Sequence, residues 1–223
     1  MQQMYEKSKH GFLISHNLKR ERGAKKEMND LINSYSSVSD GVVETNVQVN
    51  SSSDIDKQLA LELSELKQKK GVFDTGVDCL LFTAIDKNPM EFLETIFSGA
   101  KRDNFIAKET QRIVPLQRVD MASSPEKLLT TTKELISEFN FSNYKTFAIK
   151  YACRNNSVFD KKQIIDTVAK MMPDDLKVDL NNPDITLYIE IFYRGLGVSL
   201  IETQKVVQLM DFNIQKYLND EHN

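Results

Sequence analysis

The sequence predicts an α+β fold on the basis of two observations. Short apolar runs rich in β-branched and aromatic residues alternate with longer segments in which apolar residues recur at helical spacing. Between these segments lie Gly, Pro, Asn and Asp residues of the kind that form turns. A chain of 223 residues can bury a substantial core, either as one large domain or as two small ones.

In the first half, the predicted elements are a strand, a helix, an insertion, a strand or hairpin, a helix and a strand, in that order. Without the insertion, their approximate ranges are 11–15, 17–35, 72–85, 90–97 and 111–119. A ferredoxin-like unit has this order of elements. We therefore expect a flexible tail at residues 1–10 and an N-terminal ferredoxin-like domain at residues 11–119. The insertion spans residues 36–70 and contains a helix that begins at Asp54.

The second half begins with a helix, a strand and a helix, and continues with a β-hairpin. The approximate ranges are 124–139, 145–153, 161–172, 185–193 and 196–201. Pro125 lies in the first turn of the first helix, and Asp160 is a suitable N-cap for the second. We assign residues 120–205 to a second domain and residues 206–223 to a C-terminal helical tail.

Basic residues gather in three segments, although the whole chain has a net charge of −3. Segments 19–26 and 145–162 each hold five basic residues and one acidic residue, and segment 101–118 holds five basic and two acidic residues. Clustered cations in an acidic chain favour local phosphate sites over a general affinity for nucleic acid. The structural alternative for each segment is a solvated face.

Cysteine and histidine usage argues against disulfides and metal sites. Cys79 and Cys153 both lie in apolar runs that read as strands, which predicts small buried side chains in a reducing compartment. The three histidines have no spacing to either cysteine that would hold a metal. No apolar run reaches the roughly 20 residues that span a bilayer, and the first residues lack a signal-peptide core. We expect an intracellular, soluble protein with no cofactor, no metal and no membrane contact.

The most informative segment is the predicted strand 145–153 together with the next three residues, Arg154, Asn155 and Asn156. A loop between a strand and a helix is a common place for binding groups. The planar guanidinium of Arg154 suits a phosphate, and the two amides suit a ribose hydroxyl or a base edge. The structural alternative is that Arg154 pairs with a carboxylate while the asparagines close a turn.

Other basic residues are further candidates for RNA contacts. Arg112 and Arg118 flank an apolar stretch, where they either face a groove at the domain junction or cover an edge strand. Cations near the Arg154 loop and at the start of the first helix would contact phosphates and add salt-dependent affinity without sequence information. They are Lys145, Lys150, Lys161, Lys162, Lys19, Arg20 and Arg22.

One segment is similar to a catalytic motif. Residues 194–199, Arg-Gly-Leu-Gly-Val-Ser, are one substitution from the loop with which acetyltransferases bind a pyrophosphate. Such a loop must run into a helix N-terminus, whereas residues 198–201 read as a strand. The sequence also has no phosphate loop ending in Lys-Ser or Lys-Thr, and no Cys-His or Ser-His-Asp constellation. We therefore predict that the protein is not an enzyme.

Two motifs resemble the THUMP domain. They are Lys-Tyr-Ala-Cys-Arg-Asn-Asn at 150–156 and Lys-Val-Asp-Leu-Asn-Asn-Pro-Asp at 177–184, followed by a strand. The similarity continues N-terminally through segments 11–13, 21–27, 74–79 and 111–116 and so covers roughly residues 11–205. In these segments the chain resembles the eukaryotic THUMP proteins that serve as tRNA adaptors for an RNA cytidine acetyltransferase.

This resemblance implies an N-terminal ferredoxin-like domain packed beside a THUMP domain, with tRNA held between or across them. It implies a non-catalytic adaptor that presents serine and leucine tRNAs to the acetyltransferase for 4-acetylcytidine formation. We also expect a monomer on its own, with a nuclear or nucleolar localisation and a cytoplasmic fraction. The alternative is a protein-interaction or assembly module without specific RNA binding.

Overall fold

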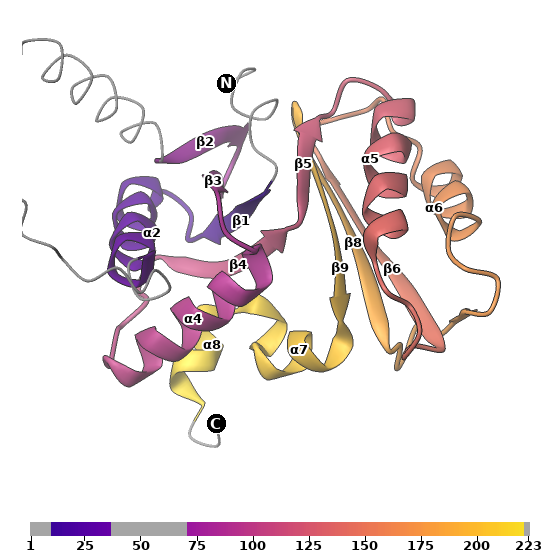
Figure 1. Cartoon of the computed structure of the whole chain (residues 1–223). Helices are drawn as coiled ribbons and strands as arrows, with labels where there is room; N and C mark the ends of the chain where they lie inside the picture. Colours follow the sequence, from indigo (N-terminus) through magenta and orange to yellow (C-terminus); the bar gives the residue numbers. More distant parts are fainter. Residues whose placement is uncertain (1–9, 37–70, 221–223) are drawn as a thin grey trace, which may run out of the picture.

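The computed structural model describes residues 10–36 and 71–220 as a mixed α+β structure with two sheets (Figure 1). Residues 1–9 of the predicted flexible tail, all but the first residue of the predicted insertion, and the predicted helix from Asp54 lie outside the described residues. His10, the last residue of the predicted tail, belongs to a strand instead. The two sheets stand side by side, and the elements at the C-terminal end lie beneath the line where they meet.

The first sheet has four antiparallel strands in the order β2-β3-β1-β4. Two helices, α2 and α4, cover one of its faces (Figure 1). The first unit, as we call this sheet with its two helices, consists of β1 (His10–His16), α2 (Glu21–Ser36), β2 (Val72–Val77), β3 (Leu80–Ile85), α4 (Pro89–Arg102) and β4 (Thr110–Leu116).

Helix α4 begins as predicted but continues beyond its predicted end. Pro89 opens it, and the Asn88 side chain accepts hydrogen bonds from the amides of Met90 and Glu91. The sequence predicts an end at about residue 97, but the helix runs to Arg102 and Gly99 lies inside it. An added Cβ there would approach Cε1 of Tyr35 on α2 to 2.4 Å. The glycine therefore permits close helix packing and does not end the helix.

The apolar run 72–85 is a hairpin and does not form one long strand. Asp78 and Cys79 form its turn, and Cys79 adopts a left-handed conformation with φ of 59°. The prediction of a buried strand cysteine at position 79 is therefore wrong. Cys153 does lie in a strand, but it is only half-buried, and both cysteines are free thiols.

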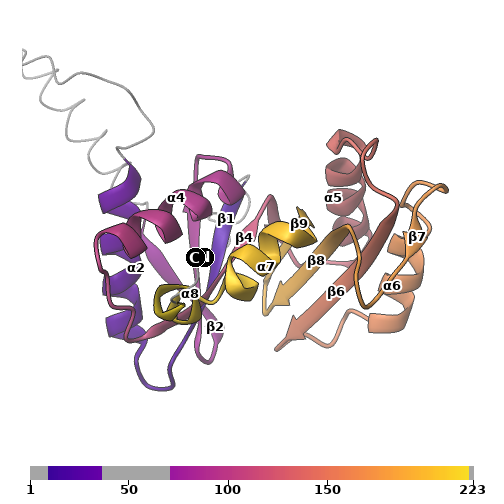
Figure 2. The same cartoon turned by 90° about the horizontal axis from the view of Figure 1, so that it is seen from below.

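The second sheet has five strands in the order β5-β9-β8-β6-β7. Helices α5 (Pro125–Glu138) and α6 (Lys161–Ala169) cover the face that points away from the first unit (Figure 2). The Ser124 side chain caps α5 and Asp160 caps α6, as the sequence predicts for Asp160. The strands are β5 (Arg118–Met121), β6 (Thr146–Arg154), β7 (Lys177–Val178), β8 (Ile185–Phe192) and β9 (Gly195–Glu202).

The strand predicted at 111–119 is divided between the two sheets. Its first part is β4, which pairs with β1, and its last part belongs to β5, which pairs with β9. Gln117 lies between them, and its amide donates to the carbonyl of Val198 and to Oγ of Ser199. The chain therefore passes directly from one sheet to the other without a linker.

Strand β8 is buried on both faces. Leu187, Ile189 and Ile191 pack beneath α5 and α6, whereas the alternate residues Tyr188 and Phe192 belong to the core of the first unit. The ring of Phe192 stacks on Phe82 of β3 with centroids 6.1 Å apart. The two units thus share an apolar interface.

The C-terminal elements return to this interface. They are α7 (Thr203–Gln208), the short 3-10 turn η1 (Met210–Phe212) and α8 (Ile214–Asn219). Helix α8 packs on α4 and β4, and the ring of Phe212 meets Tyr188 edge-on at 5.6 Å. This part of the predicted helical tail therefore contributes to the core of the first unit.

Small residues on β9 allow the two units to approach each other. An added Cβ at Gly197 would lie 2.5 Å from Cδ1 of Leu116, which is fully buried. The neighbouring Ser199 donates its hydroxyl to the carbonyl of Pro115 at 2.6 Å. The side-chain oxygen of Gln117 accepts from the amide of Leu200 at 2.8 Å.

We predict that Gly197→Ala destabilises the protein by about 1–3 kcal/mol, because overpacking a rigid buried contact costs this much. Urea unfolding followed by circular dichroism measures the change. Gly71→Ala is the matched control, since an added Cβ there would be 3.7 Å from its nearest neighbour, an ordinary contact. Equal stability of the two variants would contradict the proposed close approach of the sheets.

Candidate nucleic-acid interface

Three of the predicted RNA-binding residues lie together where the two units meet. Arg154 stands at the end of β6, Lys150 lies earlier on the same strand, and Arg112 comes from β4. Their acidic partners are Glu190 on β8 and Asp211 in η1. We call these five residues the junction cluster.

Arg154 and Glu190 form the best-defined pair of the junction cluster. Nη1 of Arg154 donates to Oε2 of Glu190 at 2.7 Å. The Glu190 side chain is only 10% exposed, whereas that of Arg154 is 40% exposed. The carboxylate therefore binds one terminal nitrogen of a guanidinium that has further N–H donors and is partly exposed to solvent.

Burial raises the pKa of Glu190 above its usual value, against the opposing effect of Arg154 and, more weakly, of Arg112. A carboxylate taken out of water is costly unless a cation compensates it. Two arginines from different units thus stabilise the charge of a single buried carboxylate.

Lys150 is held by three neighbouring groups. Its Nζ lies 3.3 Å from the hydroxyl of Tyr188, 5.3 Å from the centre of that ring, and 3.6 Å from Oδ1 of Asp211. Nε of Arg112 donates to the backbone carbonyl of Asp211 at 3.0 Å. Asp211 thus contacts both cations, one through its side chain and one through its backbone.

The turn that carries Asp211 has an unusual backbone. Met210, Asp211 and Phe212 all have left-handed φ angles, of 50°, 55° and 63°. Three successive non-glycine residues in this region are unfavourable and persist only when the surroundings enforce them. Burial of Phe212 and the Arg112 hydrogen bond supply that enforcement here.

The Arg154 loop has the contacts that the structural alternative predicts. Arg154 pairs with a carboxylate, and Oδ1 of Asn156 accepts from the amide of Val158. The side-chain amide nitrogen of Asn156 also donates to the backbone carbonyl of Tyr193 at 2.8 Å. Asn155 reaches the first unit, where its amide nitrogen lies 3.4 Å from the carbonyl oxygen of Gly76. The loop is therefore preformed.

The other predicted contacts lie outside the junction cluster. Arg118 pairs with Glu138 and donates to the carbonyl of Gln117. Lys145, Lys161 and Lys162 are exposed at the starts of β6 and α6.

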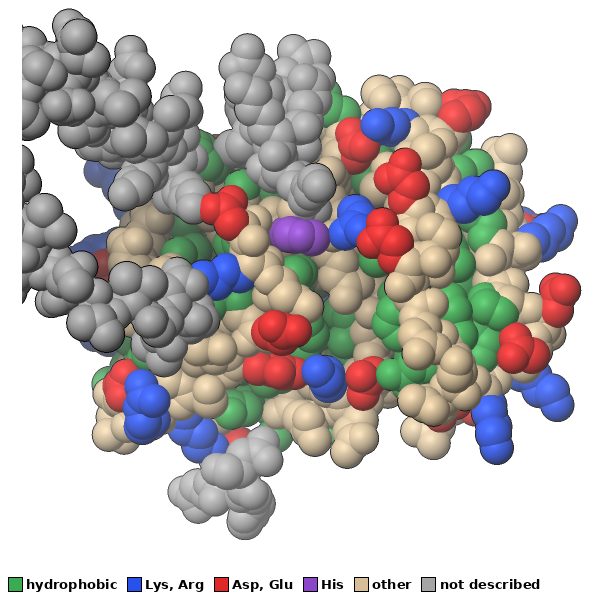
Figure 3. All heavy atoms as spheres, viewed as in Figure 1, with side chains coloured by type: hydrophobic (Ala, Val, Ile, Leu, Met, Phe, Trp, Pro, Cys, Tyr) green, Lys and Arg blue, Asp and Glu red, His purple; other side chains and the backbone are tan. Residues whose placement is uncertain are grey.

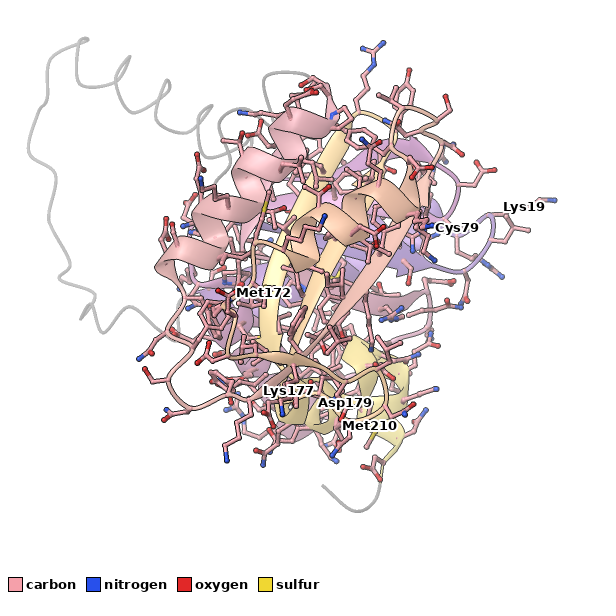
Figure 4. The ribbon with its side chains drawn as sticks, turned by 90° about the vertical axis from the view of Figure 1, so that its right-hand side faces the viewer. Lys19, Cys79, Met172, Lys177, Asp179 and Met210 are labelled. Atoms are coloured by element: carbon pink, nitrogen blue, oxygen red, sulfur yellow. The ribbon has the colours of Figure 1, made fainter. Side chains whose placement is uncertain are left out.

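The cations at the start of α2 form a separate group. Arg20 lies 3.7 Å from Glu109, and Arg22 is exposed. Lys19 projects from the molecule next to Cys79, away from Lys177 and Asp179 (Figure 4). The predicted cations thus belong to several surfaces.

Sequence reasoning missed both acidic residues of the junction cluster. One feature of the sequence does indicate a role for Glu190. It is the only charged residue in the apolar run 185–192, and a charge buried in a strand needs a partner. Asp211 left no signal, because it lies 99 positions from Arg112 in the chain.

The surface is mixed in charge. In the view of Figure 3, basic and acidic side chains alternate across the coloured part of the face. Within residues 10–36 and 71–220, no group of three or more His, Cys, Asp or Glu side chains is placed to hold a metal ion. No helix in that part of the chain has the length and apolarity to cross a membrane.

Comparisons with known proteins identify the second unit. Residues 122–201 match the THUMP domain, so the chain contains a THUMP domain. The chain is 23% identical to an uncharacterized protein of Schizosaccharomyces pombe, over 98% of this chain and 79% of that protein.

Two solved structures are similar to parts of the chain. The crystal structure of PH1313 from Pyrococcus horikoshii Ot3 matches with a TM-score of 0.48 and 15% identity, over 86% of this chain and 55% of that one. The chain thus spans little more than half of that protein. The THUMP domain of THUMP domain-containing protein 1 matches with a TM-score of 0.30 and 29% identity, over 36% of this chain and 91% of that one.

We predict a pH-dependent difference in stability between the wild-type protein and Glu190→Gln. Folding raises the pKa of Glu190, so the folded protein keeps the proton of this carboxyl more tightly than the unfolded chain does. The resulting contribution of Glu190 to the free energy of unfolding is complete below the unfolded pKa of about 4.3 and is lost as pH rises through the folded pKa. The free energy of unfolding of the wild type, minus that of the variant, should therefore fall as pH rises above about 4. Urea titrations across this range measure it, and a difference that grows with pH would contradict the prediction.

Proposed function

We propose that the protein is a tRNA-binding adaptor without catalytic activity, which presents tRNA to an RNA cytidine acetyltransferase. The observation that carries RNA binding is the junction cluster, where cations from the THUMP domain and from the first unit meet. The THUMP domain is an RNA-binding module, and residues 122–201 match it.

The geometry of the cluster suits phosphate binding. Arg154 uses one nitrogen for Glu190, and a guanidinium has five N–H donors. The Lys150 side chain is 55% exposed, and its ammonium can exchange Asp211 for a phosphate. Contacts of this kind position an RNA and add affinity that depends on salt.

The first unit supports a binding surface that spans both units. We propose that it is a ferredoxin-like domain, because its elements follow the order β-α-β-β-α-β with the sheet order β2-β3-β1-β4. Arg112 of this unit and Arg154 of the THUMP domain both act on Glu190. An RNA that bridges the junction would contact both units at once.

The adaptor role rests on the resemblance of the Arg-Asn-Asn and Val-Asp-Leu-Asn-Asn-Pro motifs to the tRNA acetylation adaptors. On the same basis we propose serine and leucine tRNAs as cargo, a nuclear or nucleolar location with a cytoplasmic fraction, and a monomeric state. The segment 194–199, considered above as a pyrophosphate loop, runs into strand β9 and not into a helix, which supports a non-catalytic role.

A protein-interaction or assembly module is the second candidate. The pairing of Arg154, Arg112 and Lys150 with acidic partners favours it, because such pairs also occur where cations only stabilise a domain interface. A gel-shift assay with folded tRNA and a DNA duplex control separates the two functions. Equal binding of both nucleic acids, or of neither, would favour the assembly module.

We predict that Lys150→Ala weakens tRNA binding several-fold and lowers the slope of log affinity against log salt by about 1, since one phosphate contact is lost. Fluorescence anisotropy at several salt concentrations measures both quantities. Lys133→Ala is the matched control, because Lys133 is exposed on α5, on the other side of the second sheet. Equal binding by both variants would remove Lys150 from the interface.

Arg154→Ala should weaken tRNA binding at least as much, because a guanidinium binds phosphate through two parallel hydrogen bonds. The substitution also leaves Glu190 buried without its partner, which destabilises a folded protein. The double variant Arg154→Ala with Glu190→Gln removes this cost and should keep the binding defect. Recovery of wild-type affinity in the double variant would show that Arg154 acts through folding alone.

In cells that lack the protein, we predict loss of 4-acetylcytidine from the tRNAs that it serves. Mass spectrometry of digested tRNA measures the nucleoside, and a restored wild-type gene should return it. The gene carrying Lys150→Ala should return less than the gene carrying Lys133→Ala. Normal acetylation without the protein would refute the adaptor role.

A further inference from the structure

An exposed aromatic residue and an arginine occupy the tip of the β8–β9 hairpin, beside the junction cluster. Tyr193 is 39% exposed, and Arg194 lies over its ring with the guanidinium carbon 5.3 Å from the ring centre. Tyr193 was not among the residues predicted to contact RNA. Arg194 was considered only as part of a pyrophosphate loop.

The hairpin tip is held by hydrogen bonds from three segments. The amide of Tyr193 donates to the carbonyl of Arg154 at 2.9 Å, and the amide of Ala122 donates to the carbonyl of Arg194 at 2.8 Å. The side chain of Asn156 donates to the carbonyl of Tyr193, also at 2.8 Å. The position of the tyrosine is therefore fixed before any ligand binds.

Tyr193 occupies a backbone conformation that is costly for its type. Its φ is 53°, in the left-handed region that Asn, Asp and Gly adopt far more readily than an aromatic residue. The ring lies beside Gly76, where an added Cβ would be 3.1 Å from Cδ1 of the tyrosine. Turn formation alone does not explain why an exposed position with an unfavourable backbone conformation is occupied by an aromatic residue, Tyr193.

We propose that Tyr193 and Arg194 form a stacking platform for one unpaired RNA base. The base would lie against the guanidinium of Arg194, with the Tyr193 ring on the other side of that cation. Aromatic rings and guanidinium planes bind unpaired bases in this way. This inference rests on the RNA binding proposed above, and the platform adjoins the backbone of Arg154. A phosphate contact and a base contact would therefore be neighbours.

The test uses an RNA hairpin with a single-stranded extension, the same hairpin with a flush end, and the extended hairpin with abasic extension nucleotides. The wild-type protein should bind the first RNA about tenfold more tightly than the other two, from the value of one stacked base. A fluorescent 2-aminopurine in the extension should lose intensity on binding. Anisotropy and fluorescence intensity are the two measurements.

Three variants of the full chain locate the effect. Tyr193→Asn removes the ring but tolerates the left-handed backbone, and Arg194→Lys keeps the charge but removes the plane. Both should bind the three RNAs with similar affinity and should quench 2-aminopurine less. Tyr193→Phe keeps the ring and should behave as the wild type.

The outcomes separate this inference from the proposed function. If the wild type binds none of the three RNAs, RNA binding itself fails, and the platform fails with it. If the wild type binds all three equally, RNA binding stands and the platform is refuted. The platform is also refuted if Tyr193→Asn keeps the full preference, or if the abasic extension binds as well as the intact one.

Discussion

The close approach of β9 to β4 is the constraint on which the rest of the structure depends. Gly197 leaves room for Leu116, and Ser199 is small enough to donate to the carbonyl of Pro115. An added Cβ at Gly197 would collide with Leu116 unless the two sheets moved apart. The chain passes from β4 to β5 through Gln117 alone, so the joint is short as well as tightly packed.

This approach explains why a carboxylate is buried in the middle of β8. One face of β8 packs under α5 and α6, and the other packs against the first unit. Every residue of the strand is therefore buried. Glu190 can remain charged there only beside cations, which Arg154 and Arg112 supply from opposite sides of the junction. The tight joint and the junction cluster are thus consequences of one packing arrangement.

Periodicity in the sequence predicted most elements, because helices and strands here bury regular stripes of apolar residues. It failed where a tertiary contact decided the outcome. Gly99 reads as a helix stop but accommodates Tyr35, and Cys79 reads as a strand residue but lies in a turn. Arg154, Lys150 and Arg112 were predicted as contacts from residue type. Their convergence on Glu190 and Asp211 was not predictable, because it depends on how two sheets pack.

The charge of the junction cluster limits how the proposed site can recognise an RNA. Three cations face two carboxylates, so a phosphate gains little from net charge and must displace or share an existing partner. Long-range attraction is also weak for a chain with a net charge of −3. Binding by such a site therefore depends on fixed geometry more than on charge. A hydrogen-bonded loop, a joint without a linker and a clamped hairpin tip supply that geometry, and under the proposed function they favour an RNA whose shape fits both units.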